Sequence, residues 1–389
     1  MHARTALLLL PVLAAAVLSP SWPNREAAHV RAETAAPAHA DTTFARLVER
    51  LSEPGGYFSS DNLVSNEASY LHVLGRMREM GIKGGAYVGV GPDQNFSYIA
   101  QLRPEVAFLI DIRRDNLLHH LLFKALFDNA RNRVEYLCLL TGRAQPSNTR
   151  GWNGATVQEI VEYVDVMPPD SIAFKESSRR VRESVLQYGV PLSEADLATI
   201  RRFHTEFHRW GLDIRYSNRF GVPLWNMPAY RQLLLETDLD GEQLNYVARE
   251  ESFRFVKDMQ RKNRIVPVVG DLAGDHALAA IGREISNRGL VISAFYVSNV
   301  EQYLMRDGVF DRFATTTAEL PFDRRSVIIR SYFGRGWPHR DNIPGYYATQ
   351  LLERIADFAN QHKNGGYTSY LELVQKNILP LRDPAELPR

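Results

Sequence analysis

Residues 86–95 read Ala-Tyr-Val-Gly-Val-Gly-Pro-Asp-Gln-Asn, in which a short apolar run ends in a glycine-containing turn. The run predicts a buried strand, and the turn leads into a helix that ends before Pro104. A second apolar run, Val106–Ile110, follows and ends on Asp111. Strand, helix and strand in this order predict one βαβ unit, in which a helix joins two parallel strands.

The same rhythm returns near the other end of the chain. Apolar runs at 265–269, 290–297 and 326–330 predict three further strands, and residues 276–285 predict a helix between the first two. Strands that alternate with helices predict an α/β fold with a doubly wound, mostly parallel sheet. We expect helices near 349–358 and 369–374 to close the chain.

Helical patterns dominate the region between the two groups of strands. A long helical stretch is expected from Asn116 to about Leu140, and a helical insertion from about 142 to 262. Within the insertion, only Leu212–Tyr216 resembles a strand. Ser193 and Asp196 have the spacing of a capping box, which predicts the start of a helix.

The first 40 residues differ from the rest. Arg4 precedes an apolar run over 6–18, which is typical of a secretory signal peptide and is too short for a stable membrane span. We therefore expect residues 1–40 to form a signal peptide and linker, and residues 41–389 to form one α/β domain. The protein is then secreted or periplasmic, or membrane-anchored or cytoplasmic if the start is misassigned.

Composition favours a small-molecule ligand. Lys and Arg number 46 and Asp and Glu 45, giving a net charge of +1, and no block of like charge stands out, which argues against nucleic acid as a partner. The single cysteine, Cys138, lies in an apolar run and is expected to fill the core.

Polar residues follow several of the predicted strands, and ligands of such sheets bind beyond the carboxyl ends of the strands. These residues are the turn Gly89–Asn95, Asp111, Asp271 and the pair Ser298-Asn299. Asp111 lies 20 residues after Gly91 (111 − 91), the spacing at which an acidic side chain holds a ribose diol.

The turn itself distinguishes two ligand classes. A dinucleotide site has G-x-G-x-x-G, but Gln94 occupies the position of the third glycine, and Asp93 would lie beside the pyrophosphate. A carboxylate repels phosphate, whereas S-adenosylmethionine carries an ammonium and a sulfonium group. The turn therefore favours S-adenosylmethionine over NAD.

Three segments carry a resemblance to a known family: Gly84–Ser97, Pro267–Gly274 and Phe295–Leu304, with Ser65-Asn66-Glu67 added. They resemble a bacterial family of unestablished activity whose core is similar to class I methyltransferases, and the likeness spans about 44–330. The resemblance implies that Gly89 and Gly91 approach the methionine part of the ligand, Asp111 its ribose and Asp271 its adenine, with Ser298-Asn299 on the substrate side. The chain departs from the usual methyltransferase pattern in its long helical insertion and in lacking a clear terminal pair of antiparallel strands.

The candidate site residues fall into two groups. The predicted cofactor-binding residues are Asn66, Gly89, Gly91, Asp93, Gln94, Asn95, Asp111 and Asp271. The predicted catalytic residues are Glu67, Asn299, Glu301 and Tyr303, with Glu301 or Tyr303 as a general base. A plainer interpretation is that Glu67 caps its own helix and Tyr303 packs.

The histidines do not predict a metal site. His204 and His208 share a helix face at the i, i+4 spacing, but no third ligand is suggested and a solvated face is expected. His119, His120 and His276 are likewise expected on helix surfaces.

Three functions remain open on the sequence. The first is a protein that binds S-adenosylmethionine or a nucleoside, with methyl transfer to an unknown substrate. The second is a non-enzymatic extracytoplasmic binding protein, which the signal peptide favours because S-adenosylmethionine is made in the cytosol. The third is an NAD-binding oxidoreductase.

Overall fold

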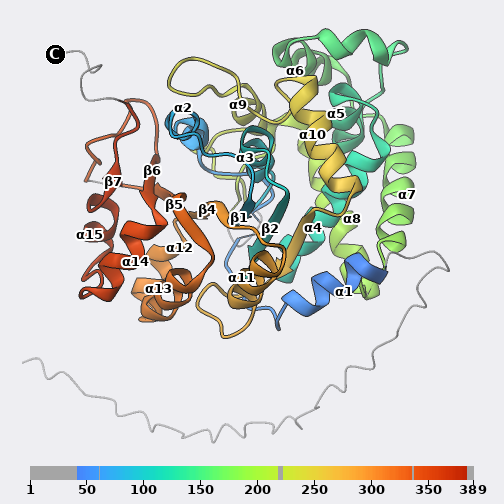
Figure 1. Ribbon diagram of the computed structural model, residues 1–389. Coiled ribbons are helices and arrows are strands. Elements are labelled where there is room, and N and C mark those ends of the chain that lie inside the picture. Colours follow the sequence, from blue (N-terminus) through green and yellow to red (C-terminus); the bar gives the residue numbers. More distant parts are fainter. Residues whose placement is uncertain (1–41, 61, 218–221, 335–336, 383–389) are drawn as a thin grey trace, which may run out of the picture. The chain divides into compact units, whose positions relative to one another are not determined.

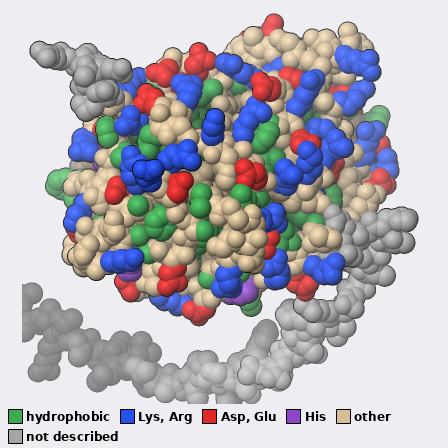
Figure 2. Space-filling model, in the orientation of Figure 1, with side chains coloured by type: hydrophobic (Ala, Val, Ile, Leu, Met, Phe, Trp, Pro, Cys, Tyr) green, Lys and Arg blue, Asp and Glu red, His purple; other side chains and the backbone are tan. Residues whose placement is uncertain are grey.

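The computed structural model describes residues 42–60, 62–217, 222–334 and 337–382 (Figure 1). The predicted signal peptide and linker lie outside these residues. Among the described helices, none is long and apolar enough to cross a membrane. Acidic and basic side chains are interspersed over the face seen in Figure 2.

A mixed sheet forms the centre of the described fold, with the strand order β3-β2-β1-β4-β5-β6-β7. Five strands run parallel: β1 (Ala86–Gly89), β2 (Val106–Asp111), β3 (Ile265–Val269), β4 (Ile292–Ser298) and β5 (Phe322–Tyr332). The chain runs outward from β1 to β3 and then returns to the other side of β1, so the strand order reverses between β1 and β4. The predicted α/β class and mostly parallel sheet are confirmed.

The last two strands are antiparallel. β6 (Thr349–Arg354) pairs with β5, and β7 (Ile378–Leu379) pairs with β6. Two predictions were therefore wrong, because 349–354 is strand rather than helix and the sheet does end in antiparallel strands. The cause is that Gln350 and Glu353, which suggest the wet face of a helix, are buried and have polar partners within the fold.

The first βαβ unit forms as predicted. Every residue of β1 is buried, and α3 (Gln94–Leu102) follows it and is buried along almost its whole length. Arg103 ends the helix in the left-handed conformation, directly before Pro104. The turn between β1 and α3 is thereby fixed at the carboxyl edge of the sheet.

Seven α-helices join β2 to β3 in the described residues, and five of them lie within 142–262, where a helical insertion is expected. They are α4 (Arg114–Asn129), α5 (Arg133–Thr141), α6 (Val157–Val166), α7 (Ser171–Gln187), α8 (Glu194–Trp210), α9 (Tyr230–Leu235) and α10 (Glu250–Arg261). In Figure 1 most of them gather on the β2 side of the sheet, and α9 is labelled between α2 (Leu74–Glu79) and α6.

Local signals within this connection were interpreted with mixed success. The capping box of Ser193 and Asp196 is present at the start of α8. The expected single helix over 116–140 is two helices, because the side chain of Asn132 caps the start of α5. The strand signal near 212–216 corresponds to a short 3₁₀ helix, Gly211–Asp213, and an isolated bridge at Arg215.

The remaining helices flank the sheet. α11 (Ala277–Asn287) joins β3 to β4, and α12 (Val300–Arg306) and α13 (Phe310–Glu319) join β4 to β5. α14 (Ile355–Lys363) packs on β5 and α13, and α15 (Tyr370–Gln375) confirms the last predicted helix. Among the described residues, three helices precede β1 in the sequence: α1 (Thr42–Leu51), a 3₁₀ helix (Ala68–Leu71) and α2 (Leu74–Glu79).

Three histidines predicted to be solvated are instead buried: His119, His120 and His204. Nε2 of His204 donates a hydrogen bond to the carbonyl of Leu139, and His119 packs among phenylalanine rings. His276 is exposed, as expected. No cluster of metal-ligating side chains occurs among the described residues, and Cys138 is buried as predicted.

Candidate functional site

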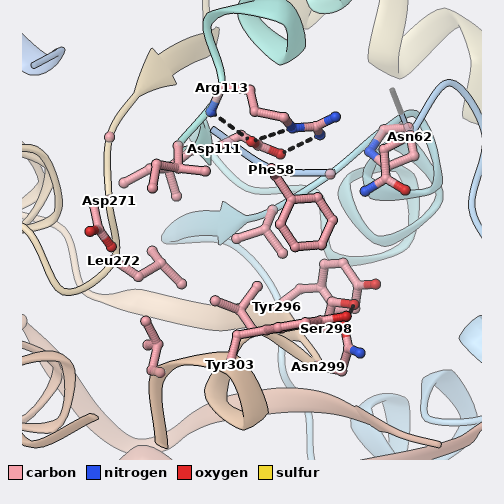
Figure 3. A pocket seen from close by; sticks show the side chains of 18 of the residues that line it. Phe58, Asn62, Asp111, Arg113, Asp271, Leu272, Tyr296, Ser298, Asn299 and Tyr303 are labelled. Carbon is pink, nitrogen blue, oxygen red and sulfur yellow. Dashed lines mark hydrogen bonds and ion pairs between the residues drawn. The ribbon is translucent and has the colours of Figure 1, made fainter. Parts of the chain in front are cut away.

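A cavity of about 260 Å³ lies at the carboxyl edge of the parallel strands (Figure 3). Its lining includes one residue from the end of each of four strands: Gly91 after β1, Asp111 on β2, Asp271 after β3 and Ser298 on β4. The structure therefore brings the predicted strand-end residues together around one space, next to the reversal of strand order between β1 and β4.

Gly91 needs to be glycine at this turn. Its φ angle is +82°, in the region that other residues rarely adopt, and a Cβ placed there would have no described atom within 4 Å. The carbonyl of Gly91 is 2.9 Å from Nε2 of His120 on α4. Burial lowers the pKa of His120 to about 4, so the ring is neutral. Its Nε2–H donates this hydrogen bond and thereby helps to hold the turn in place.

Two predicted ligand residues shape the turn rather than line the cavity. The side-chain nitrogen Nδ2 of Asn95 donates hydrogen bonds to the carbonyls of Val90 and Pro92 at 2.8 and 2.7 Å, and its Oδ1 accepts one from the hydroxyl of Tyr87. A Cβ on Gly89 would collide with that same Oδ1. Asn95 and Gly89 therefore act together to hold the backbone of the turn.

Asp93 points away from the cavity. It is buried, and its Oδ2 accepts hydrogen bonds from the hydroxyls of Tyr230 and Tyr246, the latter at 3.0 Å. Burial raises the pKa of Asp93 to about 6, and the two tyrosine hydrogen bonds oppose that rise. Asp93 thus ties the start of α3 to the helical connection, and the expected direct contact with a ligand has no support in this geometry.

Asp111 is held by a neighbour that the sequence analysis did not single out. Its carboxylate accepts from the backbone N–H and Nε of Arg113 at 2.9 and 3.0 Å, and from Nη2 at 2.9 Å (Figure 3). The guanidinium group also lies 5.8 Å from the centre of the Phe58 ring. All three residues line the cavity, so Asp111 is a fixed acceptor on its wall.

Glu67 lies at the centre of a buried polar cluster. It is 1% exposed, and its carboxylate accepts hydrogen bonds from Tyr296, Ser298, Ser331 and Gln350. The hydroxyl of Tyr296 donates at 2.6 Å and the amide of Gln350 at 3.0 Å. These partners come from β4, β5 and β6, so Glu67 joins the segment before β1 to the far half of the sheet.

Gln94 extends this cluster to the ligand turn. Its amide nitrogen donates to the hydroxyl of Tyr296, which in turn donates to Glu67. Gln94, Glu67 and Tyr296 all line the cavity. The predicted residue Asn66 also lines it, directly before Glu67.

The predicted catalytic residues after β4 separate into two sets. Asn299 and Tyr303 line the cavity, and the Tyr303 ring meets Phe58 edge to face with centroids 5.4 Å apart (Figure 3). Glu301 does not line the cavity. It is buried and forms an ion pair with Arg330 at 2.5 Å, so a proton-transfer role toward a ligand lacks support for it.

Sequence reasoning missed Phe58, Asn62, Arg113, His120 and Tyr296. Arg113 had a visible signal, since it follows a strand-end aspartate by two residues. His120 also had one, because it lies in the almost wholly apolar run from Leu117 to Phe123. Phe58 and Asn62 belong to a loop before the 3₁₀ helix, and no pattern in the sequence places that loop over the cavity.

Fold and site together define the class of protein, an open α/β sheet with a ligand-sized cavity at its reversal of strand order. Residues 62–378, most of the chain, match a domain of unknown function, DUF7790, and the chain belongs to this family. The comparison with curated proteins finds no match.

Proposed function

We propose that the cavity binds S-adenosylmethionine or a related nucleoside, and that the protein transfers the methyl group of this ligand to an acceptor. The observation that carries the proposal is the placement of Gly91 and Asp111. The register pairs Gly89 on β1 with Leu109 on β2, so that Gly91 and Asp111 follow at the same level. An open turn beside an acid on the next strand suits a nucleoside whose ribose diol meets the acid.

The charge of the cavity wall supports a cationic ligand. Two guanidinium groups and four carboxylates line it, so its formal charge is −2 (2 − 4), from Arg113, Arg306, Glu67, Asp111, Asp271 and Asp307. Such a wall disfavours the pyrophosphate of NAD and favours the sulfonium and ammonium of S-adenosylmethionine. This preference comes from the wall as a whole, and Asp93 has no part in it.

A second candidate is a binding protein that does not transfer the methyl group. The hydrogen bonds of Glu67 favour it, because a carboxylate that four donors hold in place on the cavity wall is suited to position a ligand. The predicted export from the cytosol, where S-adenosylmethionine is made, points the same way. Methyl transfer itself separates the two candidates, whereas binding is common to both.

Calorimetric titration of two matched glycine variants tests the proposal. Gly91→Ala puts a methyl group into the cavity at φ +82°, and Gly241→Ala makes the same change at φ +81°, also with no described atom within 4 Å of the new Cβ. Because Gly241 does not line the cavity, the two variants share the backbone strain but not the effect on the site.

We expect the wild type to bind S-adenosylmethionine and S-adenosylhomocysteine more tightly than NAD. Gly91→Ala should weaken both adenosyl ligands at least about tenfold, a change of about 1.4 kcal/mol, while Gly241→Ala leaves them unchanged. Tighter binding of NAD to the wild type, or equal affinities in both variants, would contradict the proposal.

A further inference from the structure

Glu301 and Glu353 are buried carboxylates that share a cationic partner, whereas the buried Asp93 has tyrosine hydroxyls as its partners. Arg330 is within 2.5 Å of Glu301 and 2.6 Å of Glu353, and Arg113 holds Asp111. Glu67 is as deeply buried, yet in the described part of the chain its hydrogen-bond partners are three hydroxyls and one amide. A buried carboxylate without a counterion is costly, and Glu67, unlike Asp93, lines the cavity, where a ligand can supply the cation.

The two carboxylate oxygens of Glu67 are not equally occupied. Oε2 accepts from Tyr296, Ser331 and Gln350, whereas Oε1 accepts from Ser298. A carboxylate oxygen has two lone pairs, so Oε1 retains capacity for a further donor.

A second acceptor belongs to a residue of the same hydrogen-bonded cluster. Oε1 of Gln94 is buried and has no hydrogen-bond partner among the described residues. Gln94 and Glu67 bond the same hydroxyl, that of Tyr296, and all three residues line the cavity. A buried acceptor left without a donor costs free energy, and a ligand that donates to it removes that cost.

The backbone at Ser298 supports the same reading of the site. Ser298 has φ +52°, in the left-handed region that disfavours a residue with a Cβ, and its hydroxyl bonds Glu67. Strained conformations of this kind cost free energy and cluster at active sites and ligand-binding sites.

We propose that Glu67 Oε1 and Gln94 Oε1 form a subsite for a primary ammonium group, so that the natural ligand carries an aliphatic amine. An ammonium group has three hydrogen-bond donors and is a cationic partner for the carboxylate of Glu67. The inference rests on the proposed function, since both place a ligand in this cavity. It deepens that function, because it locates the amine of an adenosyl amino acid at the Glu67 end of the cavity.

The test is a calorimetric comparison of S-adenosylhomocysteine with its desamino analogue, which lacks only the α-amine. We expect the wild type to bind S-adenosylhomocysteine at least about tenfold more tightly. In Glu67→Gln, which keeps the shape and one acceptor oxygen but removes the negative charge, this difference should vanish while the affinity for the desamino analogue is unchanged. Unchanged binding of the analogue shows that the variant still folds around its cavity.

Glu242→Gln is the matched control. It makes the same change at an exposed carboxylate that is paired with Arg249 and does not line the cavity, so the amine preference should persist. Loss of the preference in Glu242→Gln and its survival in Glu67→Gln would overturn the assignment to Glu67.

Spermidine as a third probe separates this inference from the proposed function. Equal affinity of the wild type for the two adenosyl compounds refutes the ammonium subsite and leaves the adenosyl proposal standing. Binding of spermidine to the wild type but not to Glu67→Gln, with neither adenosyl compound bound, supports the subsite and refutes the adenosyl ligand. Binding of none of the three refutes both.

Discussion

Replacement of Asp93 by asparagine should change how stability depends on pH and leave ligand preference alone. In the folded protein, burial raises the pKa of Asp93 from 3.8 to about 6. The folded state therefore holds a proton that the unfolded chain releases near pH 4. The contribution of Asp93 to the stability of the wild type must fall as pH rises from about 4 to about 6, whereas asparagine does not titrate.

The size of the effect follows from the shift. About two pKa units at about 1.4 kcal/mol each give about 3 kcal/mol. The unfolded chain is already more than half deprotonated at pH 4, so the free energy of unfolding of Asp93→Asn, minus that of the wild type, should rise by about 2.4 kcal/mol between pH 4 and pH 7. Taking the difference at each pH cancels the titration of the other carboxyl groups, which both proteins share.

Urea denaturation of both proteins at pH 4, 5, 6 and 7 measures this difference. Tyr230→Phe provides a second check, because its hydroxyl donates to Asp93 and lowers the pKa; without it the loss of stability should extend to higher pH. A difference that is flat or falls with pH would refute the buried placement of Asp93. A changed preference between S-adenosylmethionine and NAD in Asp93→Asn would refute it independently, by showing that this carboxylate faces the ligand.

Three further predictions concern the core, the cavity wall and the N-terminus. Arg330→Met leaves Glu301 and Glu353 buried without their cation and should lower the free energy of unfolding, measured by urea denaturation, by about 3–5 kcal/mol. Lys262→Met, which breaks an exposed ion pair, should lower it by less than about 1 kcal/mol. Similar losses in the two variants would contradict the role of the buried triad. Phe58→Ala should weaken the binding of adenosyl ligands, measured by calorimetry, with little change in thermal stability. The reason is that the half-buried Phe58 ring lies between Arg113 and Tyr303 on the cavity wall. An unchanged affinity would show that Phe58 is not part of the binding site. Mass spectrometry of the protein from its native compartment should find a mature chain beginning at residue 17, 22 or 41, and an intact Met1 would show that the predicted signal peptide is wrong.

The parallel strands could be predicted because they are buried on both faces and appear as continuous apolar runs, such as Val106–Ile110. β6 could not, since Gln350 and Glu353 are polar residues at buried positions, and their partners Glu67 and Arg330 are distant in sequence. Local patterns report periodicity and capping, but they do not report a tertiary partner that makes a polar side chain acceptable in the core.

The residues of the site also differ in whether a local sequence pattern could predict them. Strand-end residues such as Asp111 and Asp271 were predictable, because the carboxyl ends of parallel strands meet at one edge of the sheet. The direction of Asp93 was not, because Tyr230 and Tyr246 lie 137 and 153 residues further along the chain. Glu67 was correctly placed at the cavity, but its four donors come from three strands that no local pattern connects to it.

A crystal structure of the protein grown with S-adenosylhomocysteine tests the adenosyl site most directly. We expect the ligand in the cavity, with its ribose hydroxyls at Asp111 and its amine within hydrogen-bonding distance of Oε1 of Glu67 and Oε1 of Gln94. An empty cavity at a saturating ligand concentration, or the ligand bound elsewhere on the protein, would contradict the proposed site.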